Sequence, residues 1–415
     1  MRGRYSAAPW LGLAALACGV PAPPQPEQNV ALPEAGPCGR GFVVIESNYQ
    51  STNVGLVSLA GEVLTGSLLA STLPAGELVP TLSGDVVASS SLARDDTFVL
   101  VDRSPESSRL LFVELSSGAI VKRVALDTGF ASYPQDYVEI SPEKGYVTRF
   151  GHNRRPGRAP FDHGSDVIVV SPESGEIIGS IDLRASLPDA EDTLPRPSRV
   201  ALVGERAFVL LATLPVDGFV AAVESQLAVV NTKTDEVEDT IALSGLRNCA
   251  GMTVTEAGER LAVTCSALTD SDGGSDVEAS GIALVALTPE PHLERVIPGS
   301  ALGARPVGFS SSFIERDTLL VTSFGVYDGN DVIAKDRLLR VDLATEGVSE
   351  LLQGEPFTLG AISCAEGCGT CLVADAARRG GVVHRYVYES GEILRAQTIK
   401  LEETIGLPPR YLSRF

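Results

Sequence analysis

The sequence lacks the residue patterns from which a reaction could be named. It contains one tryptophan, Trp10, and four histidines in 415 residues. It has no Gly-x-Ser-x-Gly nucleophile turn, no glycine-rich phosphate loop and no His-Glu-x-x-His pair. An active site assembled from single residues of distant segments would leave no such motif. The sequence therefore does not exclude an enzyme, but it names no reaction.

Positive charge is scarce as well. Lysine and arginine number 33 against 53 aspartate and glutamate residues, and the formal net charge is −20. So acidic a surface repels the phosphates of nucleic acids and of anionic lipid headgroups, and we expect neither as a partner. The acidic surface suits either solubility alone or the recognition of a cationic partner.

Long helical patterns and long apolar runs are also missing. The apolar runs are short, are rich in Val, Ile, Leu and Phe, and have turn residues at both ends, which is typical of β-strands. The run Trp10–Ala17 is too short to span a bilayer. The sequence predicts an all-β protein.

The chain does contain one pattern seven times, a turn residue between two apolar strand-like runs. Successive turn positions differ by 45 to 60 residues. A repeat of about 50 residues with four strands per unit predicts a β-propeller, here with seven blades of four antiparallel strands. Six blades, with one weak unit misread, is the alternative. The turn residues are Gly61, Gly118, Gly175, Asp235, Glu290, Glu346 and Gly391.

The third and fourth units are the clearest, and we name their strands a to d in chain order. The first unit lacks strand a, because only Gly41–Ser47, Val54–Leu59 and Glu62–Leu68 fit strands b, c and d. The last residues, Leu407–Phe415, resemble a strand a. We therefore expect them to pair with Gly41–Ser47 and close the ring, which hides the strand edges. Residues 41–415 would form one propeller domain. The strands predicted for the third and fourth units are Tyr137–Ser141, Gly145–Arg149, Asp166–Ser171 and Glu176–Leu183, then Ser198–Val203, Ala207–Ala212, Gln226–Asn231 and Glu236–Leu243.

Residues 1–17 are typical of an export signal. Arg2 and Arg4 precede the apolar run, and small residues follow it. The segment Ala15-Leu16-Ala17-Cys18 resembles a bacterial lipobox, which implies that Cys18 is diacylated and becomes the mature N-terminus. An ordinary secretory signal with an incidental Cys18 is the alternative.

The lipoprotein resemblance also predicts a location. Gly19 after the cysteine implies the outer membrane, on its periplasmic or surface face. Residues 18–40 are rich in proline and show no hydrophobic period, so we expect a lipidated tether there.

Six cysteines remain apart from Cys18, and an even number in an exported chain predicts disulfides. The spacing Cys364-x3-Cys368-x2-Cys371 also matches a radical iron–sulfur motif, but that chemistry needs a reducing compartment and an α/β barrel. The strand arrangement places two pairs across the a–b turns of the fifth and seventh units, and the third pair across the ring closure. Among the fifteen possible connectivities, we favour Cys249–Cys265, Cys364–Cys371 and Cys38–Cys368.

The third unit carries a family resemblance. Tyr137–Thr148 and Asp166–Ile181 resemble the two halves of the YVTN-type propeller repeat, and the third, fourth and seventh units follow it closely. The resemblance implies a β-propeller and little about function. Because the single tryptophan, Trp10, lies in the signal, propeller repeats with tryptophan signatures are disfavoured, namely the WD, sialidase and quinone-binding types.

The most basic segment of this acidic chain is 151–163. Two histidines and Asp162 could hold a metal, and clustered arginines could bind a carboxylate or phosphate; a surface loop that pairs with neighbouring acids is the alternative. The candidate binding residues are His152, Arg154, Arg155, Arg158 and His163.

A second loop is acidic. Oxygen ligands at alternate positions around Gly273 and Gly274 are what Ca²⁺ requires, although a solvated acidic loop fits the same residues. The candidate Ca²⁺ ligands are Asp270, Asp272, Asp276 and Glu278. We expect no other cofactor.

The b–c connections are long in units three to six, so one sector of one face is elaborated. Our first hypothesis is a monomeric, non-enzymatic propeller that is lipid-anchored and binds a protein or an envelope polymer through these loops. The second is an envelope hydrolase or lactonase-like enzyme with a metal near the central channel. The third is a Ca²⁺-stabilised structural module.

Overall fold

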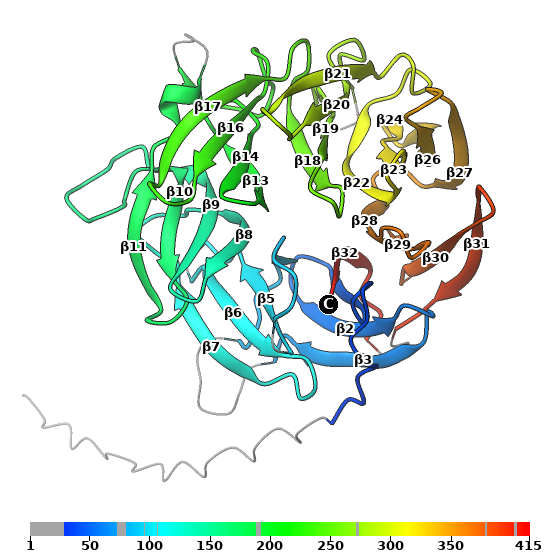
Figure 1. Cartoon of the computed structure of the whole chain (residues 1–415), viewed down its shortest axis with the longest axis horizontal. Coiled ribbons are helices and arrows are strands. Elements are labelled where there is room, and N and C mark those ends of the chain that lie inside the picture. Colours follow the sequence, from blue (N-terminus) through cyan, green and yellow to red (C-terminus); the bar gives the residue numbers. More distant parts are fainter. Residues whose placement is uncertain are drawn as a thin grey trace, which may run out of the picture.

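The computed structural model describes residues 29–72, 80–94, 96–105, 107–187, 192–270, 274–377, 380–401 and 405–415. Seven four-stranded antiparallel sheets stand around a central axis (Figure 1). The predicted seven-bladed β-propeller is thereby confirmed. Within the described residues the helical content is one 3₁₀ turn, Arg184–Ser186, and no helix is long and apolar enough to cross a membrane.

Each blade runs from an inner strand a to an outer strand d. Blade 1 consists of β32 (Pro409–Arg414), β1 (Gly41–Ser47), β2 (Thr52–Ser58) and β3 (Val63–Ala70). Blade 2 consists of β4 (Val86–Ala88), β5 (Thr97–Asp102), β6 (Arg109–Glu114) and β7 (Ile120–Ala125). Blade 3 consists of β8 (Pro134–Ser141), β9 (Lys144–His152), β10 (Gly164–Ser171) and β11 (Glu176–Ile181). Blade 4 consists of β13 (Pro197–Val203), β14 (Arg206–Leu211), β16 (Gln226–Asn231) and β17 (Glu236–Ala242).

The remaining blades repeat this order. Blade 5 consists of β18 (Cys249–Val254), β19 (Arg260–Cys265), β20 (Gly281–Ala286) and β21 (His292–Pro298). Blade 6 consists of β22 (Val307–Glu315), β23 (Thr318–Ser323), β26 (Asp336–Asp342) and β27 (Val348–Gly354). Blade 7 consists of β28 (Leu359–Ala365), β29 (Thr370–Asp375), β30 (Val382–Glu389) and β31 (Glu392–Ile399). Two short hairpin-like pairs lie in loops, β12 (Thr193–Leu194) with β15 (Leu214–Pro215), and β24 (Val326–Asp328) with β25 (Asp331–Ala334).

The repeated turn residues all lie between strands c and d. Six of the seven adopt the left-handed conformation, with φ between 58° and 90°; Glu290 is the exception. A tight c–d turn needs a positive φ. Glycine adopts this conformation without strain, and aspartate and glutamate adopt it at a moderate cost. This shared requirement is the physical reason that the repeat was visible in the sequence.

The ring closes where the sequence predicts. β32 pairs antiparallel with β1, with Phe42 opposite Arg414 and Val44 opposite Leu412. The Phe415 carbonyl accepts hydrogen bonds from the Arg40 and Gly41 amides. The structure also contains the three favoured disulfides, Cys38–Cys368, Cys249–Cys265 and Cys364–Cys371.

The apolar core is divided between neighbouring blades. One cluster joins the facing sheets of blades 3 and 4, and another joins those of blades 5 and 6. Because the strands are short and apolar on both faces, each sheet needs a neighbour on each side, and full burial of one such Val or Leu contributes about 1.5–3 kcal/mol. A closed ring is the arrangement in which every sheet finds two neighbours.

Two buried aspartates connect consecutive blades. Asp136 of β8 accepts hydrogen bonds from Ser90 in blade 2 and from the Val200 amide in blade 4. Asp336 of β26 accepts four backbone N–H groups, which it draws from two separate segments. Burial raises the pKa of both carboxyls, while these hydrogen bonds act in the opposite direction.

The predicted export signal, residues 1–17, and Cys18 lie outside the described residues. Of the expected tether, residues 29–40 lie against the propeller. Val30 is buried in the cluster between blades 1 and 2, and its amide donates to the Ser116 carbonyl. An apolar side chain and the disulfide at Cys38 together hold this segment to the ring.

Candidate functional site

The inner strands define two faces of the ring. Every inner strand begins on the face that carries the b–c loops and ends on the face that carries the a–b and c–d turns. We call the first the loop face and the second the turn face. The long b–c loops, 153–163, 212–225, 266–280 and 324–335, all belong to the loop face.

The basic loop of blade 3 is held at its base by Arg149. This guanidinium is fully buried and bidentate to Asp166, at 2.8 and 2.7 Å. It also donates to the Phe161 carbonyl and to Thr128 Oγ1, at 2.8 and 2.7 Å. With its donors satisfied, Arg149 acts as an anchor that fixes the loop on the loop face.

The structure brings the predicted basic residues to the rim of the loop face. Arg154 pairs with Asp217 in the b–c loop of blade 4. Arg155 and Arg158 are exposed, and within the described residues neither has a carboxylate partner within 4.0 Å. Burial lowers the pKa of His152, and the positive charge of Arg196 lowers it further.

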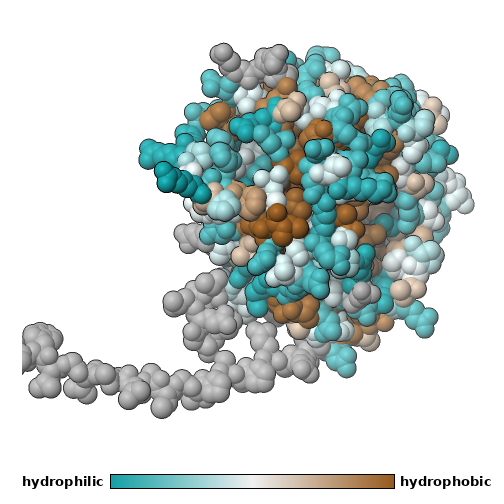
Figure 2. Space-filling model, turned by 60° about the vertical axis from the view of Figure 1, so that its left-hand side comes forward, coloured by the Kyte–Doolittle hydropathy of each residue, from teal (hydrophilic) through white to brown (hydrophobic). Residues whose placement is uncertain are grey.

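The neighbouring loop of blade 4 adds apolar groups. Phe219 is 74% exposed and Val220 is 51% exposed, next to Asp217. On the b–c loop of blade 6, Val332 and Ile333 are likewise exposed. Figure 2 shows one face of the molecule, on which hydrophilic residues surround a group of apolar residues near the middle. Single apolar residues on a surface are normal, but several at the tips of long loops mark contact residues.

The acidic loop does not present a metal site in the described residues. Asp270 accepts the Gly274 amide at 2.8 Å, and Asp276 lies 3.8 Å from Arg247. Asp272 lies outside the described residues. In the part of the chain that the structure describes, no three His, Cys, Asp or Glu side chains come together as metal ligands, either here with Glu278 or at His152 and His163.

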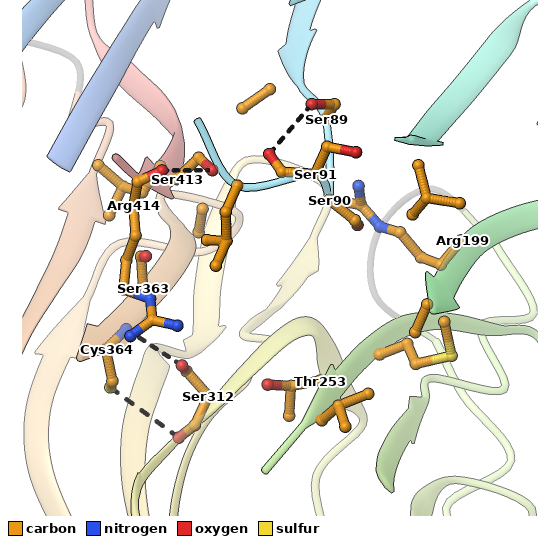
Figure 3. Close-up of a pocket in the computed structure, with 18 of the residues that line it drawn as sticks. Ser89, Ser90, Ser91, Arg199, Thr253, Ser312, Ser363, Cys364, Ser413 and Arg414 are labelled. Carbon is orange, nitrogen blue, oxygen red and sulfur yellow. Dashed lines mark hydrogen bonds between the residues drawn. The ribbon is translucent and has the colours of Figure 1, made fainter. Parts of the chain in front are cut away.

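A pocket of about 650 Å³ occupies the central channel. It takes residues from the inner strand of every blade, mid-strand residues in β13, β22 and β28 and later ones in the others, together with Glu256 and Glu366 of two a–b turns. The pocket therefore extends from the middle of the channel toward the turn face. Figure 3 shows its polar lining. The lining includes Ser89, Ser90, Ser91, Arg94, Glu139, Arg199, Thr253, Glu256, Phe309, Ser310, Ser312, Ser363, Glu366, Tyr411, Ser413 and Arg414.

Several of the pocket serines have a structural role. Ser91 Oγ accepts the Glu139 amide of the next blade at 2.7 Å. Ser310 and Ser312 of β22 accept the amides of Ile362 and Cys364 in β28, at 2.8 and 3.1 Å. These hydroxyls satisfy backbone donors on the inner edge of each sheet, where no further strand is available.

The charged residues near the turn face are mostly paired. Arg94 lies 2.6 Å from Glu139, and Arg414 lies 3.7 Å from Glu256. The Glu366 carboxylate accepts the Glu256 amide, and burial raises the pKa of Glu366. Among the described residues that line the pocket, Arg199 is the cation without such a partner.

Sequence reasoning missed this pocket. Its residues come from seven strands spaced along the whole chain, so no motif joins them. Two serine runs are the signal that could have indicated a polar channel: Ser89–Ser91, directly after the inner strand of blade 2, and Ser310–Ser312, in the inner strand of blade 6.

Comparisons with known proteins support the fold. No family model and no curated protein matches the chain. Among solved structures, a putative 6-phosphogluconolactonase from Bacteroides fragilis is 11% identical, with 92% of this chain and 99% of that chain covered and a TM-score of 0.54. A protein from Lactobacillus plantarum is 10% identical, with 90% and 98% covered and a TM-score of 0.54. The β-propeller domain of Cps50 (Swd1) from Myceliophteria thermophila is 11% identical, with 84% and 96% covered and a TM-score of 0.50. At such identities the similarity establishes the β-propeller architecture, a scaffold on which many functions occur.

Proposed function

We propose that the protein is a lipid-anchored β-propeller of the bacterial cell envelope, at the outer membrane, that binds a protein or an envelope polymer through its loop face over blades 3–6. The observation that carries this proposal is the pairing of exposed arginines with exposed apolar side chains on adjacent loops. Arg155 and Arg158 lie on one loop, and Phe219 and Val220 on the next, with Arg154 and Asp217 joining the two loops. Aromatic and arginine side chains contribute most to protein interfaces.

The position of the N-terminal segment supports the same assignment. Val30 bonds to the c–d turn of blade 2, and Cys38 bonds to Cys368 in the a–b turn of blade 7. Both turns belong to the turn face. A lipid on Cys18 would attach the protein through that face, so the loop face would point away from the membrane and toward a partner.

The metal-dependent hydrolase receives no comparable support. The pocket near the central axis contains carboxylates, but the described residues offer no set of three metal ligands there. A binding role requires no such set.

Charge reversal on the basic loop is expected to abolish partner capture. The acylated protein and its Arg155→Glu/Arg158→Glu variant would be used as bait in envelope extracts, and the captured species identified by mass spectrometry. Two unfavourable charges at an interface each typically cost several kcal/mol or reduce the association rate, so we expect at least a tenfold loss of the specific partner.

Arg395→Glu is the matched control, because Arg395 is an exposed arginine on β31, the outer strand of blade 7. It should leave capture unchanged. If the Arg155→Glu/Arg158→Glu variant captures the same species as the Arg395→Glu control and the unmodified protein, the loop face of blade 3 is not the binding site.

A further inference from the structure

Arg199 is unusual among the arginines of this chain. It is half-buried within the channel pocket, yet among the described residues it donates no hydrogen bond and has no carboxylate within 4.0 Å. Its positive charge acts on the buried Asp136, where it opposes the rise in pKa that burial causes. A guanidinium carries five N–H donors in a rigid fork that matches a carboxylate, and here the fork is presented to the cavity.

A β-bulge places Arg199 in the pocket. Pro197 pairs with Leu211, and Arg199 pairs with Leu210, so Ser198 is an extra residue in β13. Such bulges change the direction in which the following side chain points. The Val200 amide, which follows directly, donates to Asp136 at 3.1 Å. The backbone on the C-terminal side of Arg199 is therefore fixed, while its side chain extends toward Ser90 (Figure 3).

The pocket combines this cation with hydroxyl and apolar groups from other blades. The hydroxyls of Thr253 and Ser363, which come from blades 5 and 7, take part in no hydrogen bond with the described residues. Phe309 is 40% exposed although it lies on an inner strand. In β22 three residues, 308–310, stand opposite one residue of β23, because Val307 pairs with Ser323 and Ser311 with Val321. Phe309 lies within this irregular stretch, lines the pocket, and packs edge-on against Phe324 of the b–c loop, with ring centroids 5.0 Å apart.

We propose that the channel pocket binds a small hydroxylated carboxylate, namely an acidic sugar of the uronate type. Arg199 would hold the carboxylate, Thr253 and Ser363 would bond to the ring hydroxyls, and Phe309 would contact the apolar face of the ring. A cavity of about 650 Å³ lies within the range of small-molecule sites. The other pocket arginines, Arg94 and Arg414, already have carboxylate partners nearer the turn face.

This site uses other residues than the proposed partner-binding loops, because Arg155, Arg158, Phe219 and Val220 do not line the pocket. Partner capture on the loop face and sugar binding in the channel can therefore each fail or succeed alone.

Binding of sodium glucuronate to the purified propeller, measured by calorimetry, tests the proposal. We expect glucuronate to bind and neutral glucose to bind at least tenfold more weakly. We expect Arg199→Gln to weaken glucuronate binding by roughly 10- to 100-fold, the range for loss of a charged hydrogen-bonded pair. Arg199→Lys keeps the positive charge but not the planar pair of donors. Its affinity for glucuronate should therefore lie between those of the unmodified protein and of Arg199→Gln.

Three further measurements decide the outcome. Thr253→Val, which removes a hydroxyl without a protein partner, should weaken glucuronate binding a few-fold, and Arg395→Gln on the outer surface should not change it. Circular dichroism shows whether each variant folds. If Arg199→Gln does not fold, the Arg199→Lys and Thr253→Val variants decide the outcome.

The absence of glucuronate binding, equal binding by Arg199→Gln, or equal binding of glucose would overturn the proposal. Inorganic phosphate that binds as tightly as glucuronate would overturn the sugar assignment.

Discussion

Replacing Asp336 with alanine is expected to lower the free energy of unfolding by about 3–5 kcal/mol, because four buried backbone N–H groups lose their acceptor. The Asp336 carboxylate accepts the amides of Gly325, Phe357, Thr358 and Leu359, at 2.6 to 2.9 Å. Alanine would leave four backbone N–H groups without an acceptor in a buried place, and each such group costs about 1–3 kcal/mol when it stays dry. Water that enters the gap would reduce the total.

Urea denaturation followed by fluorescence and by circular dichroism would measure this effect. Asp336→Asn should be intermediate, because its amide keeps one acceptor oxygen and turns an NH₂ group toward amide donors. Asp331→Ala is the control, since Asp331 is exposed on β25 of the same loop, and it should leave the midpoint unchanged. Equal midpoints for the Asp336 and Asp331 variants would mean that the carboxylate does not hold blades 6 and 7 together.

Removing the Cys38–Cys368 disulfide is the second change with a large expected effect. The two cysteines are 330 residues apart in sequence, so the bridge restricts almost the whole unfolded chain. Loop-entropy reasoning assigns such a bridge about 3–5 kcal/mol of stability. Neither cysteine is buried, so a Cys38→Ala/Cys368→Ala variant loses the covalent link with little change in packing.

Hydrogen exchange would locate the loss. The amides of β1 and β32 should exchange faster in the double variant, because these strands form the closing pair. The Cys249–Cys265 bridge, which spans 16 residues, should protect the amides of blade 5 equally in both proteins. Unchanged exchange at β1 and β32 would show that strand pairing alone keeps the ring closed.

The sequence predicted the strands and their closure because both depend on local patterns. Gly41–Ser47 and Gln226–Asn231 were predicted with the bounds that the structure shows. Short apolar runs between turn residues determine such strands, whatever lies next to them. The cysteine pairs followed in turn from the strand order, because each pair lies at positions that the blade arrangement brings opposite one another.

The sites were less predictable, because they depend on contacts between blades. The basic loop was visible as a composition, but its link to Asp217 and the partly buried Arg196 beside it came only from the structure. Arg199 looked like any polar residue in a strand. Its place in the channel depends on the extra residue Ser198 in β13, which shifts the alternation of side chains by one position near the start of a seven-residue strand.

The pairing of β1 with β32 has a consequence for how the molecule is made. The first sheet begins near residue 41 but lacks its axial strand until the tail that ends in Phe415 has been synthesised and delivered. Until β32 is in place, the exposed border of β1 would be a place where a chaperone could dock or another copy could associate wrongly. Loss of β32, by a premature stop codon or by proteolysis, would therefore damage the closing sheet more than a nick of equal size in an outer loop.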